Sequence, residues 1–144
     1  MPHFSESVEI KRSPEDVWTL LGHPEQWLEG YLEASDRSSD YPGPGTHDDH
    51  LYRTRMKEQV TARVTRSEPG ATLEEDQEGK TFKRHVQYSL SPAMGGGTFL
   101  RVEDDVDFKG LGKLAGPIAS RDIQQRWQTS LQKLKSAAES GAST

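Results

Sequence analysis

The chain has 144 residues, which suits one domain with its own core, and we expect residues 1–144 to form a single unit. Its formal net charge is −5 at pH 7 without a basic stripe, which argues against a nucleic-acid partner. It contains no cysteine, which excludes disulfides, thiolate catalysis and cysteine-ligated metals and fits a reducing cytoplasm. No apolar run approaches ~18 residues and no signal peptide is evident, so we expect a cytoplasmic protein without a membrane span.

The first part of the chain predicts one strand followed by two short helices. Phe4–Ile10 alternates between apolar and polar residues at period two, which is typical of a half-buried strand. Ser13 can cap a helix that opens with Pro14 and ends at Gly22. A second short helix is expected at Glu25–Gly30. Both helices would be inserted between the first and second strands of a sheet.

The middle of the chain predicts four further strands. Tyr31–Ser35 is expected to form a short strand, and the Pro- and Gly-rich segment Asp36–Thr46 to form a loop. His50–Met56 and Gln59–Arg66 alternate and predict a hairpin, and Ala71–Asp76 predicts the fifth strand. These segments extend one antiparallel sheet.

The turn of that hairpin decides which of its side chains face inward. A three-residue turn at Lys57–Gln59 would place Tyr52, Thr54 and Met56 inside. A two-residue turn would instead bury two arginines, and burying unpaired guanidinium groups is costly. We therefore expect the three-residue turn.

The clearest pattern is a hairpin between Lys80 and Gly110, which follows a turn at Gln77–Lys80. Its two segments alternate strictly and are joined by a Pro/Gly-rich turn centred on Met94. One face is apolar except for one arginine opposite one aspartate, as in a sheet with one buried face. The expected cross-strand pairs are Leu90–Thr98, Tyr88–Leu100, Val86–Val102, Arg84–Asp104 and Phe82–Val106.

After Gly110 the apolar residues recur at steps of three and four, which predicts one long amphipathic helix to about Glu139. Gly116–Pro117 should kink it or split off its first turn, because proline lacks an amide proton and clashes with the preceding turn. Only this helix is long enough to cover the buried face of the sheet, so the fold class is α+β, with a curved seven-stranded antiparallel sheet wrapped around the helix. Its apolar positions are Leu111, Leu114, Ile118, Ile123, Trp127, Leu131 and Leu134.

Three ionisable residues are expected to meet on the concave face. If Leu73 faces Arg84 across the fifth and sixth strands, then Glu75 lies diagonal to Arg84, which also faces Asp104. A buried guanidinium could hold a ligand carboxylate, enolate or carbonyl, and a carboxylate with a raised pKa could take a proton from carbon. The alternative is a structural ion network.

The remaining cavity wall would be apolar and aromatic. Its expected members are Tyr52, Phe82, Val86, Tyr88, Leu100, Val102, Ile118 and Trp127. No metal site is expected, because His47 and His50 would point to opposite faces of an extended segment and could not bind one ion together.

Several short motifs resemble those of the START-like superfamily, the polyketide cyclase/dehydrase and lipid-transport group. Their order and spacing cover nearly the whole chain. The resemblance implies a helix-grip fold with a cavity between the long helix and the sheet, and no cofactor. The motifs are Val8-Glu-Ile10, Ser13-Pro-Glu-Asp-Val-Trp18, His23-Pro-Glu-Gln-Trp27, Gly43-Pro-Gly-Thr46, Gly96-Gly-Thr98 and Leu131-Gln-Lys-Leu-Lys135.

Three functions remain open. The first is binding of a hydrophobic or aromatic small molecule, such as a lipid or polyketide, by a monomer or homodimer. The second is a polyketide cyclase or dehydratase, in which Arg84 would polarise a carbonyl, Asp104 or Glu75 would take a proton and a tyrosine would assist. The third is a protein-interaction module of the co-chaperone kind. Whether the protein is an enzyme is left undecided, since fold does not decide function.

Overall fold

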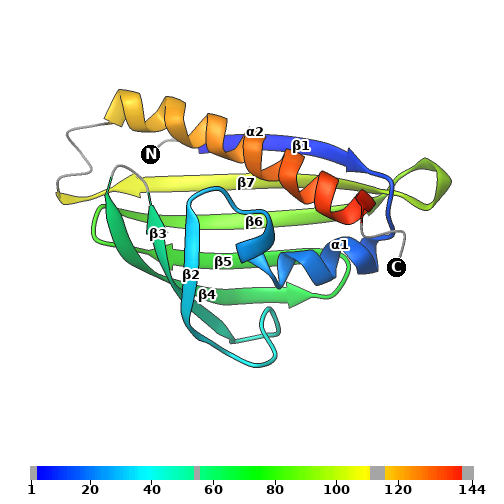
Figure 1. The fold of residues 1–144 in the computed structure, drawn as a ribbon, viewed down its shortest axis with the longest axis horizontal. Coiled ribbons are helices and arrows are strands. Elements are labelled where there is room, and N and C mark those ends of the chain that lie inside the picture. The colour runs from blue at the N-terminus through cyan, green and yellow to red at the C-terminus, as the bar shows by residue number, and fades with distance from the viewer. Residues whose placement is uncertain (1–2, 54–55, 111–115, 141–144) are drawn as a thin grey trace.

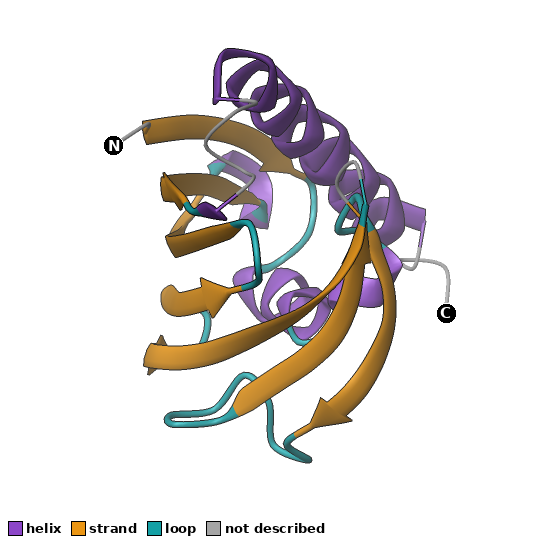
Figure 2. Ribbon diagram, turned by 90° about the vertical axis from the view of Figure 1, so that its left-hand side faces the viewer, coloured by secondary structure: helices purple, strands orange, loops and turns teal. Residues whose placement is uncertain are grey.

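The protein folds into one curved antiparallel sheet with helices on its concave side (Figures 1 and 2). The computed structural model describes residues 3–53, 56–110 and 116–140, with side chains from 121 onward in the last range. The strand order β1-β7-β6-β5-β4-β3-β2 is that of consecutive hairpins, with β1 added beside β7. The strands are β1 (His3–Ile10), β2 (Tyr31–Arg37), β3 (His47–Arg53), β4 (Lys57–Glu68), β5 (Thr72–Glu78), β6 (Phe82–Pro92) and β7 (Thr98–Phe108).

The long helix α2 (Gly116–Ser140) runs alongside β1 and closes the concave face (Figure 1). Trp127, Leu131 and Leu134 are buried against the sheet, as the spacing predicted. Leu111, Leu114 and the side chain of Ile118 lie outside the described residues. Within the described residues, no helix is long and apolar enough to cross a membrane.

The two short helices lie between β1 and β2, as expected. Helix α1 (Pro14–Leu21) begins where predicted, because the Ser13 hydroxyl accepts a hydrogen bond from the Asp16 amide at 3.3 Å. The second helix, η1 (Pro24–Gln26), is one turn of 3₁₀ helix rather than the longer helix expected at Glu25–Gly30. Together they cover one end of the sheet (Figure 2).

The β6–β7 hairpin forms with the predicted inner face, but the predicted register is wrong by two residues. Arg84 faces Val106 rather than Asp104, and Asp104 faces Val86. The reason is the turn, where Gly95 and Gly96 adopt positive φ and centre the hairpin on Gly95 rather than on Met94. A shift by an even number keeps each side chain on its face. The same shift separates the other expected pairs: Leu90 faces Leu100, Tyr88 faces Val102, Phe82 faces Phe108 and Thr98 faces Pro92.

The second hairpin also departs from the expected turn. Strand β4 already begins at Lys57, so the expected turn at Lys57–Gln59 is wrong, and Met56 is exposed rather than inward. Tyr52 is buried, as predicted, whereas Thr54 lies outside the described residues. In this register Glu58 faces Tyr52 and is buried. Its carboxylate accepts hydrogen bonds from the amide and the hydroxyl of Thr81.

Candidate functional site

The concave face carries buried ionisable side chains among its apolar ones. Asp48, His50, Glu75, Arg84 and Asp104 are each exposed by 8% or less. Moving a charge out of water costs several kcal/mol unless hydrogen bonds and opposite charges compensate, so these contacts decide what the interior can do.

Strand β5 reaches Arg84 through a residue that the sequence analysis placed in a turn. Leu73 faces Tyr88 and Glu75 faces Val86, so the predicted pairing of Leu73 with Arg84 is wrong by four residues, although Glu75 still lies diagonal to Arg84. Strand β5 continues to Glu78, and Gln77 therefore faces Arg84. Gln77 accepts a hydrogen bond from Arg84 Nε at 3.0 Å and donates one to Glu75 Oε2 at 3.0 Å. Gln77 thus links the two predicted residues.

Asp104 is the carboxylate nearest to Arg84. The distance from Asp104 Oδ2 to Arg84 Nη1 is 3.6 Å, which is long for a hydrogen bond, and Oδ2 accepts one from Trp127 Nε1 at 2.8 Å. The other oxygen, Oδ1, is buried and has no hydrogen-bond partner among the described residues. Burial raises the pKa of Asp104, although the nearby Arg84 charge and the Trp127 hydrogen bond oppose this.

Aromatic rings surround the Arg84 guanidinium. Its central carbon lies 5.6 Å from the ring centre of Tyr52, 5.2 Å from that of Phe82 and 5.7 Å from that of Trp127. Each contact is within the range of cation–π attraction. The three predicted wall residues therefore form an aromatic cage around the predicted cation, and a flat ligand could stack there.

The loop between β2 and β3 supplies a tyrosine to the interior. Tyr41 donates a hydrogen bond to Glu75 Oε1, and Gln77 donates to the other carboxylate oxygen. Burial raises the pKa of Glu75, and these two hydrogen bonds only partly oppose it. The pKa of Glu75 therefore depends on whether Tyr41 and Gln77 donate to its carboxylate.

A second buried polar group lies on β3. The hydroxyl of Tyr31 and Nε of Arg37 both donate to Asp48, and Asp48 Oδ2 lies 3.4 Å from His50 Nδ1. Burial alone would raise the pKa of Asp48, but the hydrogen bonds from His50 and Arg37 outweigh it and lower the pKa. The other ring nitrogen of His50, Nε2, is buried without a partner among the described residues.

A small enclosed cavity of about 10 Å³ lies between these groups. That is room for roughly one water molecule, which could reach His50 Nε2 and the Glu75 carboxyl. Its polar lining is Tyr41, Asp48, His50, Glu75, Gln77 and Tyr88.

The remaining predicted wall residues lie inward. Val86, Tyr88, Leu100 and Val102 are all buried, and Tyr88 contacts the Trp127 ring edge-on at 6.0 Å. The side chain of Ile118 is outside the described residues. His47 and His50 point to opposite faces, as the alternation predicted, because only His50 is buried.

Sequence reasoning missed Tyr41, Asp48, His50 and Gln77. The signal for Asp48 and His50 was present, since they share parity with the inward Tyr52 once β3 is extended back to His47. The signal for Gln77 was the same parity along a longer β5. Tyr41 belongs to a loop, where alternation gives no guide.

The comparisons with known proteins agree with this architecture. The sequence profile of the family described as "Polyketide cyclase / dehydrase and lipid transport" matches residues 1–139. No curated protein sequence shows a significant match.

Among solved structures, the chain is similar to TTHA0849 from Thermus thermophilus, with a TM-score of 0.79 and 15% identity over 97% of this chain and 99% of that one. It is also similar to a START superfamily protein from Mycobacterium smegmatis (TM-score 0.76, 18% identity, 96% and 97% covered) and to CV1439 from Chromobacterium violaceum (TM-score 0.76, 16% identity, 95% and 96% covered). At these identities the structures show the fold, which is the helix-grip fold. With its family profile matched over nearly the whole chain, the protein belongs to the polyketide cyclase/dehydrase and lipid-transport family.

Proposed function

We propose that the protein binds a small, largely apolar or aromatic molecule between the sheet and α2, with an oxygen-bearing group directed at Arg84 and Asp104. The observation that carries the proposal is Asp104 Oδ1, a buried acceptor without a partner among the described residues, beside a caged guanidinium. Buried polar atoms are nearly always hydrogen-bonded, and an unpaired one calls for a ligand or a water.

The two groups set requirements on the ligand. Arg84 donates hydrogen bonds and favours a carboxylate, enolate or carbonyl oxygen. Asp104, when ionised, accepts from a hydroxyl or amide group. A hydroxylated aromatic ketone or an acid with a flat apolar body meets both requirements, and its body would contact Tyr52 and Trp127. The proposal includes a cytoplasmic monomer or homodimer that needs no cofactor.

A ligand that extends toward Glu75 must displace Tyr41, because the enclosed cavity there holds only about one water. The hydrogen bond between Tyr41 and Glu75 would then be exchanged for one to the ligand. The loop between β2 and β3 is thus the segment whose movement would accompany binding.

Acid–base catalysis in the same place is the second candidate. The observation that favours it is that burial raises the pKa of both Glu75 and Asp104. A carboxyl group shifted in this direction can accept a proton from an acidic C–H group. Arg84 would polarise the adjacent carbonyl, and a tyrosine such as Tyr88 or Tyr41 would assist.

Native mass spectrometry of the purified protein, paired with a denatured run, tests the binding proposal. We expect an adduct that disappears on denaturation and whose mass identifies the ligand class. Arg84→Met should weaken its rebinding about 10-fold or more, because a hydrogen bond to a charged group is lost. Arg101→Met is the matched control, since Arg101 is an exposed arginine on β7, and it should bind as the wild type does.

Two results would count against binding: a bare protein that gains no thermal stability from a panel of flat phenols and acyl acids, or equal affinity in both arginine variants. The second candidate is separated by incubation of the recovered ligand, or of an enolisable aromatic ketone, in deuterated water. Catalysis predicts a changed product or deuterium uptake that Glu75→Gln or Asp104→Asn abolishes. Simple binding leaves the ligand unchanged.

A further inference from the structure

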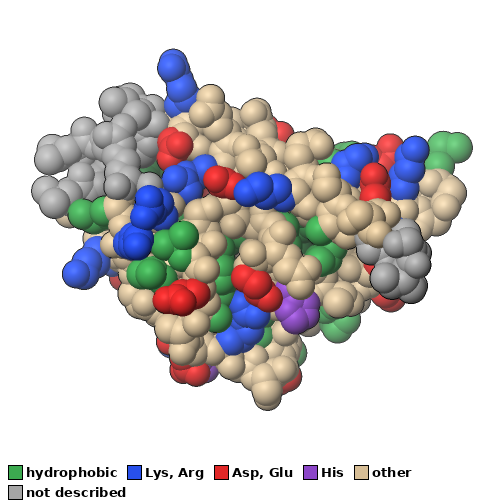
Figure 3. All heavy atoms as spheres, viewed as in Figure 1, with side chains coloured by type: hydrophobic (Ala, Val, Ile, Leu, Met, Phe, Trp, Pro, Cys, Tyr) green, Lys and Arg blue, Asp and Glu red, His purple; other side chains and the backbone are tan. Residues whose placement is uncertain are grey.

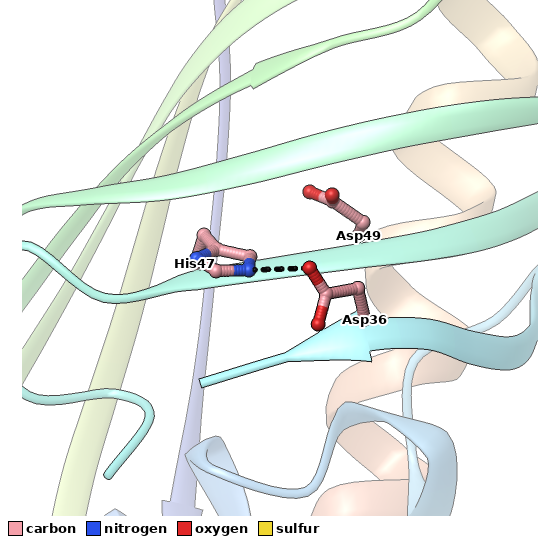
Figure 4. Close-up of side chains that lie close together, drawn as sticks. All are labelled: Asp36, His47 and Asp49. Carbon is pink, nitrogen blue, oxygen red and sulfur yellow. Dashed lines mark hydrogen bonds and ion pairs between the residues drawn. The ribbon is translucent and has the colours of Figure 1, made fainter. Parts of the chain in front are cut away.

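Three metal-ligating side chains converge on the outer face of the sheet, away from the interior. Asp36 lies on β2, and His47 and Asp49 lie on β3, with all three side chains directed to the same side (Figure 4). One nitrogen of His47 and one carboxylate oxygen from each aspartate all lie within 4.8 Å of one another. Atoms at this spacing can be bridged by one central ion with small rotations of the side chains.

A bulge in β2 creates this arrangement. Ala34 faces His50, yet Asp36 faces Asp49, so one extra residue lies on the β2 side. The insertion moves Asp36 from the face of Ala34 to the face of Asp49, and bulges often re-aim side chains in this way. It sets two carboxylates opposite each other, and like charges at paired positions are destabilising unless a cation offsets them.

His47 is oriented as a metal ligand would be. Its Nδ1 lies 3.0 Å from the Ser38 hydroxyl, and its Nε2 lies 3.1 Å from Asp36 Oδ2. Metal-binding histidines usually donate one ring N–H to a neighbouring oxygen, which fixes the tautomer and leaves the other nitrogen for the ion. The Ser38 hydroxyl can accept that hydrogen bond.

Asp49 provides an independent indication. Its Oδ1 is shielded from solvent and has no hydrogen-bond partner within the part of the chain that the structure describes. The side chain as a whole is partly exposed, so solvent can reach the cluster while this oxygen lacks a donor. A bound cation would satisfy it.

We propose that Asp36, His47 and Asp49 bind one divalent transition-metal ion, such as Zn²⁺, with water at the remaining positions. One imidazole nitrogen and two carboxylate oxygens suit Zn²⁺ and its neighbours better than Mg²⁺ or Ca²⁺, which prefer ligand sets made only of oxygen. No metal site was predicted from His47 and His50, because these two histidines lie on opposite faces of one segment. Here the additional ligand comes from the neighbouring strand.

His85 offers a matched comparison on the same face. It also has two carboxylate neighbours, but its Nδ1 contacts Asp76 at 2.7 Å and its Nε2 contacts Glu74 at 2.9 Å. The two carboxylates lie at opposite ring nitrogens and do not converge on one point. His85 should therefore not bind a metal with them.

Isothermal titration of tag-free protein with Zn²⁺ at about pH 7.5 tests the proposal. We expect one ion per chain, with affinity reduced about 10-fold or more in His47→Gln and in Asp36→Asn. Asp36 is 72% exposed at its side chain, so that variant should fold normally. His85→Gln should bind as the wild type does.

Long-range ¹H–¹⁵N spectra of the imidazole groups identify the bound nitrogen. Zn²⁺ should shift Nε2 of His47 and leave His85 unchanged. The proposal is overturned if the wild type does not bind Zn²⁺, or if His47→Gln and Asp36→Asn bind it with wild-type affinity. Because the ion would lie on the face opposite Arg84, neither outcome bears on the proposed interior ligand.

Discussion

At the scale of single residues, the buried ion pair of Arg84 and Asp104 can be compared with the exposed ion pair of Arg101 and Glu103. Their closest nitrogen–oxygen distance is 3.6 Å, and Arg101 and Glu103 are separated by the same 3.6 Å at the surface. Solvent screens the second pair but not the first. The two pairs therefore separate the effect of burial from the effect of distance.

We expect Arg84→Met to lower the free energy of unfolding by about 3 kcal/mol or more, because Asp104 would be left as an uncompensated buried charge. Asp104→Asn should also destabilise, and the double variant should be clearly less destabilised than the sum of the two. Urea denaturation of the four proteins measures this coupling. The same cycle on Arg101 and Glu103 should give about 0.5 kcal/mol or less. Additive effects in the buried cycle would show that the pair does not interact.

The pKa of Glu75 should depend on Tyr41. Burial raises this pKa, and the hydrogen bond from Tyr41 opposes the rise. Tyr41→Phe should therefore raise the pKa further, as ¹³C NMR of the side-chain carboxyl would show. Tyr31→Phe, which removes the hydroxyl that donates to Asp48 instead, should have the smaller effect. A fall in the pKa of Glu75 in Tyr41→Phe would contradict this account.

The sign of the linkage follows from the direction of the shift. The folded protein holds the Glu75 proton to a higher pH than the unfolded chain does. Stability contributed by this site therefore falls as pH rises from the ordinary glutamate range through the folded pKa. Burial of Glu75 thus lowers the stability of the folded protein at neutral pH, a cost that a protein selected only for stability would not need.

The alternation of inward and outward residues along each strand made the members of the buried cluster predictable. It did not make their hydrogen-bond partners predictable. Alternation alone placed Arg84, Glu75 and Asp104 on one face, and all three are there. Their contacts depend on strand length and register, which is why Gln77 was assigned to a turn. Tyr41 reaches Glu75 from a loop, and no periodicity describes a loop.

At the scale of elements, the first helix depends on its cap. Ser13 accepts the Asp16 amide, and Pro14 occupies the first helical position. We expect Ser13→Ala to lower the free energy of unfolding by about 1 kcal/mol, since that amide would lose its acceptor. Ser5→Ala at an exposed position of β1 is the control and should change stability by less than about 0.5 kcal/mol. Thermal and urea denaturation measure both, and equal effects would refute the cap.

Registers were the least predictable feature of the elements. The β6–β7 register is offset by two residues and the β5–β6 register by four from the sequence expectation. Both offsets are even, so each side chain lies on the face predicted for it although its cross-strand partner differs. Turn geometry sets the register, and at Gly95 and Gly96 two left-handed residues in succession moved the centre of the turn.

At the scale of the whole molecule, the order of elements and the pattern of apolar residues were enough to predict one sheet around one helix. The ligand could not be predicted in the same way, because it depends on a few unsatisfied atoms such as Asp104 Oδ1. On the face that carries α2, basic and acidic side chains are interspersed (Figure 3). The two faces of the sheet use charge differently: the concave face buries it, and the convex face pairs it in the open.

A row of alternating charges crosses the convex face from strand to strand. The register pairs His3 with Asp105, Asp105 with His85, and His85 with Asp76. Partial burial lowers the pKa of His85, but hydrogen bonds to Asp76 and Glu74 outweigh it and raise the pKa above the ordinary value. The charge interactions across these four strands therefore depend on whether the histidines are protonated.

Stability from this row should therefore decline as pH rises. A histidine whose pKa is higher in the folded state contributes fully below its unfolded pKa, and the contribution is lost as pH rises through the folded pKa. We expect His85→Gln to be more destabilising at about pH 5.5 than at about pH 8.5. Lys83→Gln, which removes a lysine from the same strand and face, is the control and should show no such dependence. Urea midpoints at both pH values measure the difference. An equal loss at both would mean that His85 acts through packing rather than through its charge.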